Sequence, residues 1–494
     1  MKLYQIKLAL FRPAILLLVT GLLLASLPGG NFSNQSAKAT VIDTACRFGI
    51  TSPLGSDGYP IAVLGVGSYL DWGAVTNPVL PDGVEYIRVL RLRDDLYLHT
   101  LANLPAWIQA NPGSVWVVGN EPDTTFGDQD ELLPEVYADR YYEVARIIRR
   151  LDRTAQIAFG SIVQPTPIRM RYLDRAWNQL VAVAGGSNAA SRLIDIWSIH
   201  SFILNEESGF SWGTGIPPGF ENDYADAVII DLDHIDYTYS IAIFQQRVVA
   251  FRSWMAEKGE RDKPLWITEY GSLFPPIDPP GVDYVNVSDV KTYDFMLATF
   301  DFLLGASDDQ SGLPSDANRL VQRWFWYSLN EHRYNFGGTV FDPDNNKLPT
   351  EVGDRFIEYQ STYLTQPDLV PTSLAIAPIS FNPDRTLVNY QLDITIDNSL
   401  FDDATCAQVW IYDGDPEKGG SLIAGPIPSS AIRSNYGVGR LTAYWMNVEP
   451  LTQYTLGVLV QTVGVDDVYP DDNLAFFSVY TELPEMLYFP SIFR

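Results

Sequence analysis

The chain has 494 residues, which is more than one average domain and enough for a barrel followed by a smaller module. Apolar residues make up 46% of it, enough for a packed core. With 60 acidic and 33 basic residues, the formal net charge is −27, and a field of that sign disfavours nucleic acid and anionic membrane surfaces as partners.

The first 39 residues have the pattern of an export signal. A basic start with Lys2 and Lys7 precedes the apolar stretch Ala14–Ser26, and Ala37-Lys38-Ala39 fits the small-x-small cleavage rule. The apolar stretch is short for a membrane-spanning helix, although an uncleaved anchor stays open as an alternative. We therefore expect a signal peptide over residues 1–39 and a protein that is secreted or held at the cell surface.

The chain contains two cysteines, Cys46 and Cys406. Two are too few for a zinc cluster or for a scaffold built on disulfides. In an exported protein the two can pair, and the sequence leaves that pairing open.

Residues 40–364 alternate short β-like runs with longer helical stretches, which is the pattern of a parallel sheet. Eight runs are the number that a (β/α)₈ barrel, or TIM barrel, needs, and several are nearly continuous apolar runs typical of strands buried on both faces. We therefore expect an α/β barrel over residues 40–364. The predicted strands are Phe48–Thr51, Val66–Leu70, Tyr86–Leu92, Val115–Asn120, Gln156–Ile162, Ile194–His200, Leu265–Glu269 and Arg323–Leu329.

Helical spacing of apolar residues predicts the helices between these strands, and two connections are long. The long connections, residues 202–236 and 271–287, follow strand ends, so they belong on the face of a barrel where binding sites are built. The predicted helices are Pro134–Leu151, Arg171–Val183, Tyr239–Lys258 and Asp289–Leu304.

The character of the chain changes after a proline-containing linker, residues 365–372. Residues 373–482 are strand-like with turn clusters between the strands, which predicts a small all-β sandwich of the immunoglobulin-like type. Its segment Asp471–Phe477 resembles adhesion-type immunoglobulin-like modules of bacterial surface proteins. The tail, residues 483–494, is either a sorting or attachment signal or a last strand. The predicted strands are Leu387–Ile396, Ala407–Tyr412, Gly439–Val448, Tyr454–Thr462 and Leu474–Tyr480.

Two predicted barrel strands end in a glutamate. The run Val115–Val118 leads into Gly119-Asn120-Glu121-Pro122, and the proline cannot continue a strand. The run Leu265–Ile267 leads into Thr268-Glu269, and the two-residue period places Leu265, Ile267 and Glu269 on one face. Because strands four and seven lie across the mouth of an eight-stranded barrel, we expect the two carboxyl groups to face each other there.

Two facing carboxyl groups suit the hydrolysis of a glycoside. The leaving oxygen needs a proton, and the anomeric carbon needs an anion that captures its positive charge. At a separation of about 5–5.5 Å the second carboxylate attacks directly and forms a covalent sugar–enzyme intermediate. The 12 Trp and 27 Tyr of the chain suit a sugar substrate, because flat ring faces stack on sugars.

The segments Asn120-Glu121-Pro122 and Thr268-Glu269-Tyr270-Gly271 resemble those of clan A of the glycoside hydrolases. Members of this clan have (β/α)₈ barrels with a general acid/base after strand four and a nucleophile after strand seven. The resemblance covers residues 46–364. It implies that Glu121 is the general acid/base and Glu269 the nucleophile. Within the clan, the chain looks most like the glycosyl hydrolase catalytic core family, which includes endo-β-1,3-glucanases.

The resemblance also implies residues that bind the substrate. Asn120 is expected to bind the hydroxyl next to the reacting carbon, and His200, at the end of strand six, to line the sugar site. Trp326 on strand eight is our choice for a sugar-stacking tryptophan. Structural roles, as a buried histidine and a core tryptophan, are the alternatives for His200 and Trp326.

Two features of the family are harder to place. Among Arg88, Arg91 and Arg93, we choose Arg91 as the arginine near the nucleophile. Phe202 stands where the family usually has a tyrosine, so a phenol that hydrogen-bonds the nucleophile is either missing or supplied by another residue such as Tyr270.

We therefore expect a secreted retaining glycosidase that cleaves β-glycosidic bonds of an extracellular polysaccharide by double displacement. A non-catalytic surface protein that binds glycans on a degenerate barrel, and a transglycosylase, are the alternatives. The chain has no G-x-x-x-x-G-K-[ST], H-E-x-x-H or G-x-S-x-G motif, so we expect no cofactor and no metal. The expected partner is a polysaccharide or oligosaccharide, and the C-terminal module is the candidate for association with a cell surface.

Overall fold

The computed structural model describes residues 47–79, 84–125, 127–207, 213–230, 232–273, 289–331, 336–361, 367–382, 385–398, 407–429, 437–463 and 467–484. The predicted signal peptide, both cysteines and residues 485–494 of the tail lie outside these ranges. Within them, no helix combines the length and the apolar character that crossing a membrane requires.

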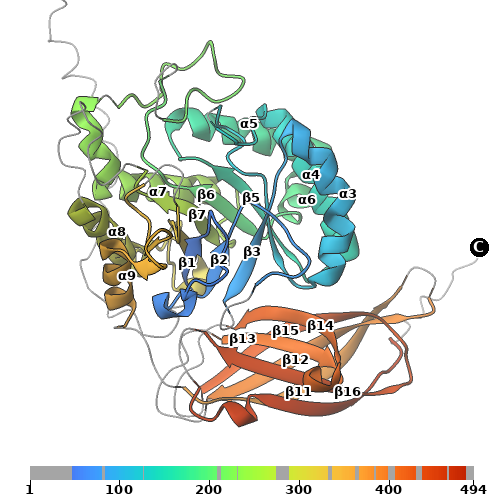
Figure 1. Ribbon diagram of the computed structural model, residues 1–494. Helices are drawn as coiled ribbons and strands as arrows, with labels where there is room; N and C mark the ends of the chain where they lie inside the picture. The colour runs from blue at the N-terminus through green and yellow to red at the C-terminus, as the bar shows by residue number, and fades with distance from the viewer. Residues whose placement is uncertain are drawn as a thin grey trace, which may run out of the picture. The chain divides into compact units, whose positions relative to one another are not determined.

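Eight parallel strands close into a barrel in the order β1 to β8, as the sequence predicts (Figure 1). β1 and β5 have the predicted bounds, and the other strands differ from the prediction by a few residues at their ends. The strands are β1 (Phe48–Thr51), β2 (Ser68–Leu70), β3 (Glu85–Leu90), β4 (Val115–Val118), β5 (Gln156–Ile162), β6 (Ile196–His200), β7 (Leu265–Gly271) and β8 (Arg323–Tyr327).

Helices surround the barrel in Figure 1, and short helices and a hairpin lie in its loops. α4 has the predicted bounds, and α5 begins four residues before its prediction because Pro167 is well suited to a first helical turn. The helices are α3 (Asp94–Ala110), α4 (Pro134–Leu151), α5 (Pro167–Ala184), α6 (Ser187–Ser191), α7 (Ile241–Glu257), α8 (Asp289–Gly305) and α9 (Glu351–Ser361). The 3₁₀ helices are Ile61–Leu64, Leu232–Tyr239 and Pro314–Asp316, and β9 (Phe341–Asp342) pairs with β10 (Leu348–Pro349).

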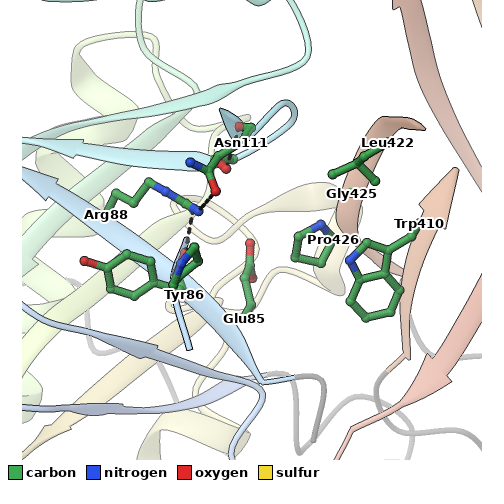
Figure 2. A pocket seen from close by; sticks show the side chains of 10 residues that line it. Glu85, Tyr86, Arg88, Asn111, Trp410, Leu422, Gly425 and Pro426 are labelled. Carbon is green, nitrogen blue, oxygen red and sulfur yellow. Dashed lines mark hydrogen bonds between the residues drawn. The ribbon is translucent and has the colours of Figure 1, made fainter. Parts of the chain in front are cut away.

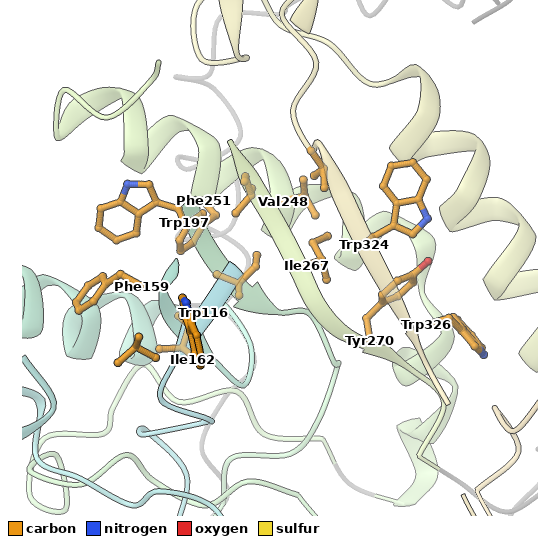
Figure 3. Packing of buried hydrophobic residues seen from close by; sticks show 14 of the residues in the cluster. Trp116, Phe159, Ile162, Trp197, Val248, Phe251, Ile267, Tyr270, Trp324 and Trp326 are labelled. Atoms are coloured by element: carbon orange, nitrogen blue, oxygen red, sulfur yellow. The ribbon is translucent and has the colours of Figure 1, made fainter. Parts of the chain in front are cut away.

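Alternation along the strands gives the barrel two apolar layers. The smaller layer fills the interior and includes Val117, Trp266 and Phe325. The larger layer lies between strands and helices, where large side chains such as Trp197 and Phe251 pack together (Figure 3). The interior is therefore packed, and polar side chains reach the barrel mouth only beyond this layer.

The C-terminal residues form an antiparallel all-β module with two sheets, β11-β12-β15 and β14-β13-β16-β17. The sequence did not predict β11 and β14, because each contains two prolines; both are edge strands, where a missing N–H is tolerated. β11 begins at Leu369, so the end of the predicted linker is part of a strand. The strands are β11 (Leu369–Phe381), β12 (Val388–Asn398), β13 (Ala407–Asp413), β14 (Ser421–Ser429), β15 (Gly437–Val448), β16 (Gln453–Thr462) and β17 (Leu474–Tyr480), with 3₁₀ helices at Pro416–Lys418 and Pro470–Asp472.

Candidate active site

Glu121 follows β4 at the carboxyl end of the barrel. The strand ends at Val118, and Gly119 has a φ of 97°, at which an added Cβ would lie 2.7 Å from the Tyr137 ring. Glycine tolerates both that angle and that contact. Glu121 itself has a φ of 42°, a conformation that costs a residue with a side chain about 1–3 kcal/mol. Its backbone N–H donates to the carbonyl of Ser161 on β5 (3.0 Å), which holds the turn at the barrel mouth.

Glu269 reaches the same mouth through a β-bulge in β7. The register against β6 and against β8 shifts after Ile267, so that β7 has an extra residue before Glu269. The prediction that Leu265, Ile267 and Glu269 share a face is wrong, because Leu265 and Ile267 pack in the outer layer. Thr268 points inward and bonds Ser198 (2.9 Å), and the bulge turns Glu269 inward as well.

His200, the last residue of β6, lies between the two glutamates. Its Nδ1 is 2.9 Å from Oε1 of Glu121, and its Nε2 is 3.4 Å from Oε1 of Glu269. A carboxylate oxygen of Glu121 lies within 4.8 Å of one from Glu269. Both glutamates are 5% exposed and His200 is 1% exposed. We call these three residues the histidine cluster; the structure brings together the pair that the sequence predicts.

In the histidine cluster, the carboxyl group of Glu269 and the ring of His200 both have raised pKa values. Burial raises the pKa of Glu269 to about 7, and the charge of Glu121 acts in the same direction, while His200, Trp72 and Arg91 act to lower it. Burial lowers the pKa of His200, but the charges of Glu269 and Glu121 and the hydrogen bond to Glu121 outweigh it, so the net pKa is raised.

Trp72 supplies the hydrogen bond to Glu269 for which the sequence suggested Tyr270. Its indole Nε1 donates to Oε1 of Glu269 over 2.7 Å. The Tyr270 side chain is fully buried in the outer layer (Figure 3). Its ring lies 5.3 Å from that of Phe244. The expected contact of Tyr270 with the nucleophile is therefore wrong, because residues 269 and 270 face opposite sides of the strand.

Trp326 also lies in the outer layer. It is 0% exposed, its Nε1 donates to the carbonyl of Gly338 (2.8 Å), and its ring packs against Tyr270. The predicted stacking of a sugar on Trp326 is contradicted by this burial, and the alternative of a core tryptophan is confirmed. Phe325 faces the interior, so alternation directs Trp326 outward and Tyr327 inward.

Tyr327 is the aromatic residue at the mouth that the sequence reasoning missed. It is half-buried, and its ring centroid lies 6.0 Å from those of Trp72 and Phe202. The Phe202 ring in turn lies 6.2 Å from His200. These rings follow the mouth from β2 through β8 to β6, and counting alternate residues from Phe325 would have found Tyr327.

Asp130 accepts hydrogen bonds from two residues that the sequence predicts to bind substrate. Arg91 Nε donates to one Asp130 oxygen (2.8 Å), and the backbone N–H of Asn120 donates to the other (2.8 Å). The Asn120 side-chain amide donates to Gln129 (2.6 Å). The structure thus places Asn120 and Arg91 beside the histidine cluster, and their contacts with substrate stay predictions.

Arg88 points away from the mouth. Its guanidinium donates to the Asn111 side chain (2.5 Å) and to the backbone carbonyl of Tyr86 (3.0 Å), as Figure 2 shows. Arg93 pairs with Asp95 near the surface (2.6 Å). Of the three arginines considered, Arg91 is therefore the one whose charge acts on Glu269.

A second cluster of buried charged residues includes two carboxylates that lie close in sequence to Glu121 and His200. Arg169 of α5 pairs with Asp123 (2.6 Å) and with Glu206 (2.8 Å), and all three side chains are 0% exposed. Arg169 also donates to Thr214 (2.6 Å), which fixes part of the long connection after β6. We call Asp123, Arg169 and Glu206 the arginine cluster.

The described residues contain two groups that could hold a metal ion. In the histidine cluster both ring nitrogens of His200 face carboxylates, which suits a protonated ring better than a metal ligand. The other group is Asp368, Asp467 and Asp472 in the β-module, where the carboxylate oxygens also lie within 4.8 Å of one another.

No protein-family profile and no curated protein matches the chain. Among solved structures, a GH128 (subgroup VII) oligosaccharide-binding protein from Cryptococcus neoformans is 14% identical with a TM-score of 0.40, over 66% of this chain and 97% of that one. A glucosidase from Croceicoccus marinus is 12% identical with a TM-score of 0.41, over 85% and 97%. A Bacteroides uniformis β-glucuronidase is 11% identical with a TM-score of 0.35, over 89% and 46%. These neighbours include enzymes and a binding protein, and scores below 0.5 establish no family for this chain.

Proposed function

We propose that the protein is a retaining β-glycosidase. The proposal depends on one observation: the carboxyl groups of Glu121 and Glu269 meet at the carboxyl end of the barrel, with oxygens within 4.8 Å. A closest approach of that size fits the roughly 5–5.5 Å between the carboxyl groups of retaining enzymes better than the roughly 6.5–9.5 Å of inverting enzymes, which admit a water.

In the first step Glu269 is the nucleophile. One of its oxygens attacks the anomeric carbon while the bond from that carbon to the leaving oxygen breaks. Glu121 gives its proton to the leaving oxygen. The products are a covalent ester between the sugar and Glu269, a released alcohol, and a Glu121 carboxylate.

In the second step Glu121 acts as a base. It takes a proton from a water that attacks the anomeric carbon, and the ester bond to Glu269 breaks. Both glutamates return to their starting states, and the sugar leaves with its original anomeric configuration.

The surroundings of the cluster favour this assignment of roles. Glu269 receives the Trp72 N–H and lies near the charges of His200 and Arg91, all of which stabilise a negative charge there. Burial and the charge of Glu121 oppose these groups and raise the pKa of Glu269 to about 7, and the mechanism uses the form in which Glu269 is ionised and Glu121 carries a proton. Tyr327 and Trp72, both half-buried, are the proposed rings for sugar stacking.

Secretion or attachment to a cell surface, and a polysaccharide substrate, are further proposals. They rest on the basic, apolar and small-residue pattern of residues 1–39 and on the aromatic mouth. Mass spectrometry of the exported protein would test cleavage after Ala39. An N-terminus upstream of that residue would contradict it.

The test of the function begins with a panel of β-glucans, xylans and mannans and the purified full-length protein. We expect reducing sugar release from at least one glycan, and Glu269→Gln should lower kcat by about 10⁵-fold. A 2-fluoro glycoside of the responsive sugar should label Glu269 covalently. Binding without release would favour the glycan-binding alternative, and products longer than the substrate would favour a transglycosylase.

Glu121→Gln separates the two roles. It should slow cleavage of ordinary glycosides by about 10³-fold, because no acid protonates the leaving oxygen. It should retain most of the first step on a dinitrophenyl glycoside, whose leaving group needs no proton. The matched control is Glu257→Gln, an exposed glutamate of α7. Covalent labelling at Glu121 in place of Glu269 would overturn the assignment.

A further inference from the structure

Trp72, in the turn after β2, donates a hydrogen bond directly to Glu269. Its Nε1 lies 2.7 Å from the Glu269 carboxylate, and the two residues are 197 positions apart in the chain. We propose that Trp72 is a positioning residue that holds the Glu269 carboxylate for attack and keeps it ionised. This proposal rests on the proposed function.

Indole chemistry suits this role. The Trp N–H is a donor that neither accepts a hydrogen bond nor titrates, so it always donates to the carboxylate. A donated hydrogen bond stabilises the charged form of an acid over the neutral form. A nucleophilic carboxylate needs that charge throughout the first step.

The turn after β2 is built to aim Trp72. Asp71 accepts hydrogen bonds from the Tyr86 hydroxyl (2.5 Å) and from the Gly73 N–H (3.0 Å). The Gly73 carbonyl accepts from the Val89 N–H (3.0 Å) and lies 3.0 Å from the Tyr86 hydroxyl, whose single proton it shares with Asp71. These contacts fix the backbone on both sides of Trp72, from which its side chain extends.

Neither of the residues considered from the sequence fills this role. Phe202 has no donor, and the Tyr270 hydroxyl lies 3.5 Å from Thr299 Oγ1 in the outer layer. The charged groups that face Glu269 are Glu121 from the end of β4, His200 from β6 and Arg91 after β3. His200 changes charge with pH, whereas Trp72 does not, so the removal of Trp72 should displace the pH profile without adding an ionisation.

The experiment compares Trp72→Phe with Trp72→3-benzothienylalanine, which replaces the N–H by sulfur and keeps the size of the ring. On a glycoside that the wild type cleaves, we expect the acid limb of kcat/KM to move upward by about one pH unit in both variants. Loss of sugar stacking alone would change KM and leave the acid limb in place. The matched control is Trp107→Phe, a half-buried tryptophan of α3, which should leave the profile unchanged.

A second measurement does not depend on turnover. Protein labelled with ¹³C at glutamate carboxyl groups is titrated by NMR, and Glu269→Gln identifies the signal of Glu269. The signal should titrate at a higher pH in both Trp72 variants than in the wild type. If the wild type cleaves no glycoside, the proposed function fails and this titration still decides the role of Trp72.

An unmoved acid limb together with an unmoved Glu269 signal in a folded variant would overturn the proposal. Circular dichroism establishes folding. Should Trp72→Phe fail to fold, the isosteric analogue gives the result, because it leaves the packing of the ring intact.

Discussion

The histidine cluster and the arginine cluster have the same composition in outline: two carboxylates and one nitrogen base between them. Glu121 and Asp123 come from the same turn after β4, and His200 is the last residue of β6, with Glu206 in the connection that follows. The difference is the base. An arginine stays charged at every accessible pH, whereas a histidine gains or loses its proton near neutrality.

This difference in the base gives the two clusters different roles. The arginine cluster is completely buried, with a permanent cation that offsets carboxylate charge, and it also fixes the connection after β6 through Thr214. In the histidine cluster, burial raises the pKa of Glu269 to about 7, and the neighbouring carboxylates outweigh burial and raise the pKa of His200, so these two groups change charge with pH. The first arrangement supports the mouth, and the second contains the residues proposed as acid and nucleophile.

The largest expected effect is the loss of the permanent cation. Arg169→Met leaves Asp123 and Glu206 buried without their shared partner, which should lower the free energy of unfolding by about 3–5 kcal/mol. Urea denaturation at neutral pH measures it. Arg153→Met, at an exposed position, is the control and should change it by less than about 0.5 kcal/mol. Equal values for the two variants would show that the arginine cluster gives no support.

Replacing the titratable base should affect activity more than folding. His200→Gln keeps a polar side chain and removes the charge, so kcat/KM should fall by about 100-fold. Its acid limb should move to higher pH, because the charge of His200 lowers the pKa of Glu269. His99→Gln, at an exposed position on α3, is the control. A loss of stability as large as that of Arg169→Met, with activity retained, would reverse the distinction between the clusters.

The smallest effect is a pH dependence of stability. Because the pKa of Glu269 is raised from 4.5 to about 7, the folded protein binds this proton more tightly than the unfolded chain, and stability falls as pH rises through that interval. Glu269→Gln removes this loss, so its advantage over the wild type should grow by about 2 kcal/mol between pH 5 and pH 8. Thermal unfolding at several pH values measures it, with Glu257→Gln as control. A constant difference would mean that Glu269 is an ordinary carboxylate.

Much of the fold could be predicted from the sequence because the barrel strands are short apolar runs between strong helical patterns. β5 and α4 have their predicted bounds. The strands that were missed, β11 and β14, contain prolines, and a local pattern does not reveal that a strand will lie at the edge of a sheet.

The sequence predicted the site residues that stand at the ends of strands. It did not predict which side chains of a strand face the barrel interior. Glu121 and Glu269 stand where apolar runs stop, which the sequence shows directly. Trp326 and Tyr270 were assigned to the site although each faces the helices, since the inward residue on β8 is Tyr327. The Trp72 contact joins strands far apart in the chain, and no local pattern predicts it.

The extra residue of β7 has a consequence for comparing sequences. In a strand without the extra residue, a glutamate points into the mouth only if it directly follows the position of Ile267, and a glutamate two positions after Ile267 would face the apolar layer beneath the helices. An alignment without a gap that pairs such a glutamate with Glu269 would therefore match two carboxyl groups with opposite orientations. Whether a related sequence has the same proposed reaction should therefore be judged by the number of residues in this strand as well as by the residue at its end.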